Sequence, residues 1–250
     1  MTQSRHFISD PRSLIVDLMR NRPLRLAMWS LLLLVPAPTL GTVAGMALSR
    51  GQIGQSIYLA SKVWLAVFPL VWLLLVERVQ LECARPTRRG LGVGAMLGLG
   101  ISVSIVGGCA VVGRSLIDAD QFRTLATRNG FGTLERYLVF CLYIVCVNAL
   151  IEEYVWRWFV VRQWQVITTA ALHGWLSVIL SAGCFTIHHV VALALQFPWP
   201  IVLIGSAGVF VGGVVWSWCY VRFGSIWPGY VSHAIVDVAV FAVGWDLLFQ

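Results

Sequence analysis

The sequence predicts an all-helical bundle with about seven membrane-spanning helices. Its 250 residues are 58% hydrophobic and 12% charged, with a mean hydropathy of +0.80, a composition unlike that of water-soluble domains. The apolar stretches reach the length of about 20 residues that a helix needs to cross a bilayer. They are too long and too uniform for the alternating strands of a transmembrane barrel, and a helix satisfies its own backbone groups in lipid.

Seven apolar segments follow one another along the chain, and their short connections predict a single transmembrane domain over residues 26–250. Ahead of it, residues 1–25 form a basic N-terminal arm, expected on the cytoplasmic side as an amphipathic segment on anionic headgroups. The first apolar segment is longer than the core of a signal peptide and is interpreted as a membrane helix. The predicted segments cover residues 26–48, 57–76, 91–112, 137–161, 171–196, 200–220 and 227–249.

The lysine, the cysteines and several glycines within these segments have expected structural roles. Lys62, the only lysine, is expected near the outer end of the second segment, where its side chain could reach the membrane surface. Five of the six cysteines fall in apolar segments without metal-binding spacing and are interpreted as small hydrophobic residues. Close helix contacts are expected at Gly94, Gly98, Gly208, Gly212 and Gly213.

The distribution of arginines indicates the orientation. With a cytoplasmic N-terminus, twelve arginines fall on the cytoplasmic side and five on the other, as the positive-inside rule favours. We therefore expect an integral protein of the plasma (inner) membrane with its N-terminus in the cytoplasm. The net charge of +7 is spread over tails and loops, so no nucleic-acid partner is expected.

Two adjacent carboxylates inside the fourth segment predict a functional site. A carboxylate in hydrocarbon costs several kcal/mol unless it is paired or faces a cavity. Glu152 and Glu153 differ by about 100° around an α-helix, so they face different neighbours. Arg157 lies one turn beyond Glu153, where it can neutralise that charge.

Ionisable side chains also occur in the fifth and seventh segments. His188 and His189 lie in the fifth, and His233 and Asp237 share one face of the seventh at a spacing of four residues. At 1.5 Å per residue, Glu152 and Asp237 both lie about 15 Å from the inner membrane surface. We expect the three helices to bring these groups to one water-accessible cavity that opens to the cytoplasm.

The polar residues form three motifs in a fixed order: EEYVWR at residues 152–157, FTIHH at 185–189 and HAIVD at 233–237. They resemble the EExxxR, FxxxH and HxxxN/D signatures of the CPBP intramembrane proteases, the family of type II CAAX prenyl endopeptidases and bacteriocin-processing enzymes. The resemblance covers residues 137–245. It implies a multi-helix membrane fold and glutamate-dependent peptide hydrolysis.

The resemblance also implies roles for single residues. Glu152 would take a proton from water and return it, and His189 would hold that water. The spacing of the FxxxH motif from Phe185 identifies His189, and not His188, as its histidine. His233 and Asp237 would face the carbonyl oxygen. Asp237 stands where the eukaryotic relatives have asparagine. Because an ionised Asp237 would repel an oxyanion, it is expected to be protonated or to orient His233. The expected catalytic residues are Glu152, His189, His233 and Asp237, and the supporting residues are Glu153 and Arg157.

Alternative functions fit the same polar groups. Two histidines with carboxylates could bind zinc, although no helix carries a histidine pair at a spacing of four residues. We therefore expect no cofactor, with zinc as the alternative. A proton- or ion-coupled transporter could also use buried Glu, His and Asp, but the two halves of the chain show no internal repeat. A catalytically silent scaffold is a third possibility. The expected partners are a membrane-associated protein or peptide substrate and the lipid bilayer.

Overall fold

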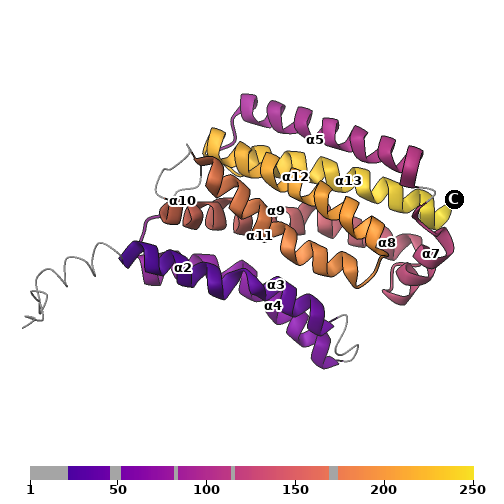
Figure 1. The fold of residues 1–250 in the computed structure, drawn as a ribbon, viewed down its shortest axis with the longest axis horizontal. Helices are drawn as coiled ribbons and strands as arrows, with labels where there is room; N and C mark the ends of the chain where they lie inside the picture. Colours follow the sequence, from indigo (N-terminus) through magenta and orange to yellow (C-terminus); the bar gives the residue numbers. More distant parts are fainter. Residues whose placement is uncertain (1–21, 46–51, 82–83, 114–115, 169–173) are drawn as a thin grey trace, which may run out of the picture.

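A computed structural model describes residues 22–45, 52–81, 84–113, 116–168 and 174–250, and these parts are helical apart from short connections (Figure 1). Within them, seven helical spans are long and apolar enough to cross a membrane, which confirms the predicted fold class. The spans are Arg22–Val43, Gln52–Glu77, Arg88–Val111, Leu134–Thr168, Trp175–Ala194, Trp199–Phe223 and Trp227–Phe249. The N-terminal arm predicted over residues 1–25 lies outside the described residues except for its last four positions.

The first four spans are each built from more than one helical element, and the last three from one. The first joins α2 (Arg22–Leu34) to α3 (Pro36–Val43), the second α4 (Gln52–Val71) to the π-helix η2 (Trp72–Glu77), and the third α5 (Arg88–Gly108) to η3 (Cys109–Gly113). The fourth consists of α8 (Leu134–Tyr143), η4 (Ile144–Asn148), α9 (Ala149–Glu152), η5 (Glu153–Val161) and α10 (Arg162–Thr168). A short helix α7 (Ala119–Arg128) precedes it, and the last spans are α11 (Trp175–Ala194), α12 (Trp199–Phe223) and α13 (Trp227–Phe249).

The fourth span is longer than predicted. It was expected to end near Val161 but continues to Thr168. Gln163 is buried in this extension, and its amide nitrogen donates to Glu77 Oε1 at 2.8 Å. Gln163, which follows the predicted end of the span, is therefore satisfied by the neighbouring second span.

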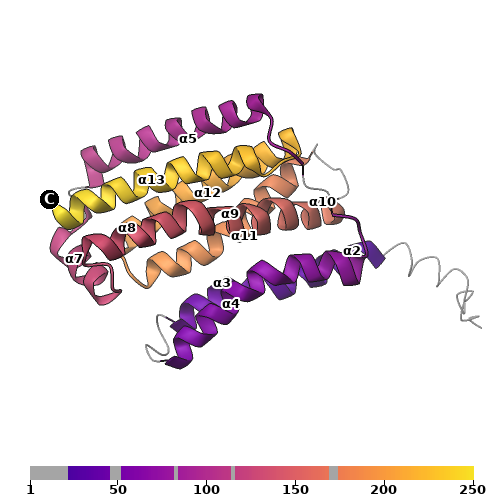
Figure 2. The same ribbon diagram turned by 180° about the vertical axis from the view of Figure 1, so that it is seen from behind.

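The spans lie roughly side by side, with α5 at one edge and the hairpin of α2, α3 and α4 at the other (Figure 1). The view from behind preserves this order (Figure 2). Between these edges, the fourth span contacts α11, α12 and α13. Its segment η5 contributes Val155, Trp156, Phe159 and Val160 to an apolar core that side chains from α2, α4 and α11 to α13 complete. Because η5 lies at the centre of the bundle, its polar side chains face other helices and not hydrocarbon.

Glycines allow α5 to approach α13 closely, as predicted. A Cβ on Gly94 would run into the backbone of Pro228, and one on Gly98 would lie 2.8 Å from the carbonyl oxygen of Ser232. A Cβ on Gly213 in α12 would similarly lie 3.2 Å from that of Ala182 in α11. The same expectation was wrong for Gly208, which faces open space.

Lys62 lies deeper than its sequence position suggested. The second span begins at Gln52 rather than at residue 57, so Lys62 is about 15 Å from its start at 1.5 Å per residue. Its ammonium donates to Asn148 Oδ1 on the fourth span at 3.2 Å.

Candidate active site

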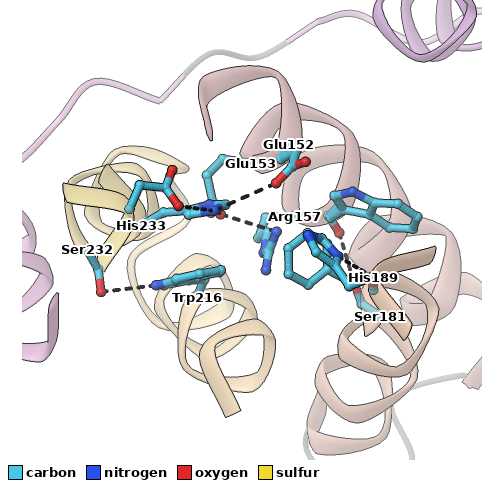
Figure 3. Close-up of polar contacts among 11 residues, drawn as sticks. Glu152, Glu153, Arg157, Ser181, His189, Trp216, Ser232 and His233 are labelled. Carbon is cyan, nitrogen blue, oxygen red and sulfur yellow. Dashed lines mark hydrogen bonds and ion pairs between the residues drawn. The ribbon is translucent and has the colours of Figure 1, made fainter. Parts of the chain in front are cut away.

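His233 on α13 lies among three carboxylates (Figure 3). Its Nδ1 is 3.0 Å from Glu153 Oε1, and its Nε2 is 3.7 Å from Glu152 Oε2 and 3.8 Å from Asp237 Oδ1. A carboxylate can only accept a hydrogen bond, so His233 donates through Nδ1 to Glu153. Its Nε2 then faces the space between Glu152 and Asp237.

Glu153 and Arg157 form the inner wall of the site. Both side chains are fully buried, and Arg157 Nη1 lies 3.2 Å from Glu153 Oε1. The guanidinium also lies over the rings of Phe185 and Trp216, with its carbon 4.4 Å and 5.0 Å from their centroids. These aromatic faces stabilise a buried cation, which gives the phenylalanine of the FTIHH motif a physical role.

The π-helical element η5 begins at Glu153 and contains both Glu153 and Arg157. Such wide turns within longer helices are frequent at functional sites. The hydroxyl of Ser181 on α11 donates to the carbonyl oxygen of Trp156 at 2.8 Å, which fastens α11 to this turn (Figure 3). On the other side, a Cβ on Gly229 would run into Glu153 Oε2. The glycine therefore permits the close approach of α13.

Trp216 on α12 supports His233 and was not predicted from the sequence. Its ring stacks on the imidazole with centroids 3.8 Å apart and an angle of 13°. The indole Nε1 donates to Ser232 Oγ at 3.0 Å (Figure 3). Trp216 lies in an apolar helix without a distinguishing motif, so only the packing of α12 against α13 identifies it.

The two histidines of α11 both approach Glu152. One ligand atom from each of Glu152, His188 and His189 lies within 4.8 Å of the other two. His189 Nδ1 is 3.0 Å from the Phe185 carbonyl oxygen, so Nδ1 carries the proton and Nε2 is free to accept. The ring of His188 stacks on Trp156 at 5.3 Å with an angle of 7°. Both histidines lie close to Glu152, so proximity to Glu152 alone does not identify which of them would hold the water.

The same three residues could hold a metal ion. Two imidazoles and one carboxylate are a common ligand set for zinc. The bond from His189 Nδ1 to a backbone carbonyl is also typical of metal-bound histidines. The alternative of a zinc site thus has a specific set of ligands in Glu152, His188 and His189.

Exposure separates the three carboxylates. The side chains of Glu152 and Asp237 are 13% and 17% exposed, whereas that of Glu153 is 0% exposed. Glu152 also lines a small pocket between the fourth span, α11 and the N-terminal hairpin. The pocket is lined by Pro38, Lys62, Leu65, Asn148, Ile151, Glu152, Val155, Trp156 and His188. Glu152 is therefore accessible from this pocket, while Glu153 is enclosed by protein.

All six residues expected from the motifs lie in one cluster. Five are linked through His233 and Arg157, and His189 joins them through Glu152 and through the ring of Phe185, whose centroid is 4.5 Å away. Sequence reasoning missed Trp216, Ser232 and the contribution of Lys62. The catalytic and supporting roles of the six motif residues remain predictions.

A family model described as "Type II CAAX prenyl endopeptidase Rce1-like" matches residues 134–239. The match begins with α8 and ends just beyond Asp237, so it covers the whole polar cluster around His233 but not Lys62. No curated protein and no solved structure is significantly similar to the chain.

Proposed function

We propose that this chain hydrolyses a peptide bond of a membrane-associated protein or peptide with water activated by Glu152. The match of residues 134–239 to the Rce1-like type II CAAX prenyl endopeptidase model supports a peptidase function. One observation carries the mechanism. Glu152 is a partly exposed carboxylate that lies beside imidazoles from two other helices, α11 and α13.

Water activation follows from the geometry around Glu152. A water between Glu152 and His189 Nε2 would donate one hydrogen bond to each, because both atoms can accept. Glu152 then takes a proton as the water oxygen attacks the scissile carbonyl carbon. When the carbon–nitrogen bond breaks, the same proton passes from Glu152 to the leaving amine, so the carboxylate is regenerated.

His233 stabilises the negative charge that develops on the carbonyl oxygen. Glu153 accepts the Nδ1 hydrogen and fixes the ring, and Trp216 holds its plane. A second proton on Nε2 would be directed at the space between Glu152 and Asp237, toward the carbonyl oxygen of a bound substrate. Preorganised donors of this kind commonly contribute a large part of catalysis. Asp237 assists in its protonated form, because an ionised carboxylate would repel the oxyanion.

The test is cleavage of a fluorogenic peptide by the purified protein in lipid vesicles. The family description suggests a farnesylated cysteine followed by two aliphatic residues and a terminal residue as the first substrate. Glu152→Gln is expected to reduce kcat by at least about 10²–10⁴-fold, because the amide keeps the shape but cannot take a proton. Glu135→Gln, an identical change at an exposed position of the same span, is the matched control.

A chelator distinguishes the metal-free mechanism from zinc catalysis. Activity is expected to persist after prolonged treatment with a zinc chelator. Complete loss that added zinc restores would instead assign Glu152, His188 and His189 as catalytic metal ligands. Full activity of Glu152→Gln would refute the glutamate mechanism in either form.

A further inference from the structure

Lys62 links the N-terminal hairpin to the fourth span, one helical turn before Glu152. It lies on α4, outside the stretch of residues 134–239 that matches the family model. Its ammonium donates to Asn148 Oδ1 at 3.2 Å and lies 5.6 Å from the centre of the Tyr58 ring. A cation within a membrane-spanning helix is costly, and such residues usually have a functional reason. Its contact with Asn148 indicates where that reason lies.

Asn148 connects Lys62 to Glu152. It is buried one helical turn before Glu152, a spacing that places both side chains on one face, and its side chain hydrogen-bonds the Glu152 carboxylate. An ammonium can only donate and a carboxylate can only accept, whereas an amide can do both. The amide oxygen therefore faces Lys62, and the amide nitrogen donates to Glu152. Lys62 thus fixes the way in which the Asn148 amide is turned.

The three side chains share one small cavity. Lys62, Asn148 and Glu152 all line it, and the free volume between them is about 10 Å³, which is room for about one water. Most of the other lining residues are apolar, Leu65 and Val155 among them. Apolar walls strengthen the attraction between an ammonium and a carboxylate. The cavity is therefore suited to hold Glu152 in place and is too small to admit a substrate group.

A general base needs a fixed direction as well as an atom that accepts a proton. Glu152 faces His189 on α11 and His233 on α13, and its flexible side chain has to be held toward them. The Asn148 amide holds the carboxylate from within the fourth span. If that amide turned over, its oxygen would face the carboxylate and repel it. Lys62 opposes this turn because its ammonium requires the same oxygen as its acceptor.

We propose that Lys62 is a positioning residue for the general base, which it holds toward α11 and α13 through the amide of Asn148. The inference rests on the proposed peptidase function and gives the N-terminal hairpin a part in catalysis. In this role Lys62 touches neither the substrate nor the attacking water. Its contribution is therefore expected in kcat, because the orientation of Glu152 matters in the transition state and not for substrate binding.

Kinetics of Lys62 variants in lipid vesicles test this role with the farnesylated peptide. Lys62→Met, which keeps the length without the charge, is expected to lower kcat by about 10–100-fold at nearly unchanged KM. Lys62→Arg retains a charged donor and should recover most of this loss. Val63→Met, at a lipid-exposed neighbour, is the control and should match the wild-type protein. Wild-type kcat in Lys62→Met, or a loss that appears in KM alone, would refute the role.

A double-mutant cycle shows whether Lys62 acts through Asn148. The variant Lys62→Met/Asn148→Leu should lose no more kcat than the more impaired single variant, because each substitution breaks the same connection to Glu152. Losses that multiply would show that the two residues act independently and would overturn the proposal. Unfolding temperatures of all variants are measured in the same detergent. Should Lys62→Met fail to fold, the shorter and neutral Lys62→Gln replaces it in the cycle.

The carboxyl carbon resonance of Glu152 separates this proposal from the peptidase mechanism. The chain has five glutamates, so isotopic labelling of their carboxyl carbons and comparison with Glu152→Gln assign this resonance by solid-state NMR in vesicles, without hydrolysis. A shift of the resonance in Lys62→Met but not in Val63→Met supports the contact even if Glu152→Gln proves fully active. An unshifted resonance in Lys62→Met overturns the proposal even if Glu152 proves to be the base.

Discussion

Glu153 has two partners in the structure where its sequence position suggested one. Its spacing to Arg157 predicted an ion pair, and the structure adds the hydrogen bond from His233 Nδ1 to the same oxygen, Oε1. The residue expected to orient His233 was Asp237, which lies 3.8 Å from Nε2. Glu153 therefore connects the buried arginine to the imidazole that faces the carbonyl oxygen.

Replacing Glu153 by glutamine should impair both stability and activity. The amide leaves Arg157 buried without its countercharge, a change that typically costs about 3–5 kcal/mol. It also weakens the orientation of His233, for which we expect a loss of about 10²-fold or more in kcat. Thermal unfolding in detergent and kcat with the farnesylated peptide measure the two effects. Wild-type values for both would contradict the assigned role.

Asp237→Asn should be the mildest change at the catalytic positions. Asparagine has the same shape and offers a neutral N–H donor toward the carbonyl oxygen, so kcat/KM is expected to stay within about tenfold of the wild-type value. Asp237→Ala, which removes the donor, is the comparison. A loss in Asp237→Asn as large as that in Glu152→Gln would show that the ionised carboxylate is required.

Trp216→Ala should lower the thermal stability of the protein clearly more than Trp216→Phe. Phenylalanine keeps an aromatic face against His233 and Arg157 and loses only the bond to Ser232, whereas alanine leaves a cavity. Loss of a buried tryptophan typically costs about 3–5 kcal/mol. Equal unfolding temperatures of the two variants in the same detergent would contradict the packing role of Trp216.

At the scale of elements, the contact between α5 and α13 positions the catalytic helix. α13 carries His233 and Asp237, and its N-terminal half rests on Gly94 and Gly98 of α5. Gly94→Val should push α13 away and lower both the unfolding temperature and kcat. Gly92→Val is the matched control, because a Cβ at Gly92 meets nothing within 4 Å. Equal effects of the two substitutions would refute the positioning role of this contact.

At the scale of the whole molecule, the described arginines predict which end of the bundle faces the cytoplasm. Arg78, Arg85, Arg88 and Arg89 lie at the end where α12 finishes and α13 begins, and Arg123 and Arg128 lie on α7 at the other. In intact cells, a membrane-impermeant thiol reagent should label Arg128→Cys but not Arg89→Cys, each in a cysteine-free background. The opposite pattern would invert the assigned orientation.

Much of the fold and site could be predicted from the sequence because the bilayer restricts what an apolar chain can do. Uninterrupted apolar runs indicate helices of membrane length, and charged residues inside them must face protein or a cavity. The three motifs therefore identified the helices that meet at the site. The end of the fourth span was not predictable, because Gln163 is satisfied by Glu77, a residue far away in the sequence.

Hydrophobicity and motif spacing alone predicted helices long and apolar enough to cross a membrane. They also predicted one cluster of six residues: Glu152, Glu153, Arg157, His189, His233 and Asp237. Only the tertiary structure decided what each touches. The stacking of Trp216 on His233 and the bond from Lys62 to Asn148 join residues on different elements. Such contacts depend on how helices pack against one another, and periodicity along one helix contains no information about its neighbour.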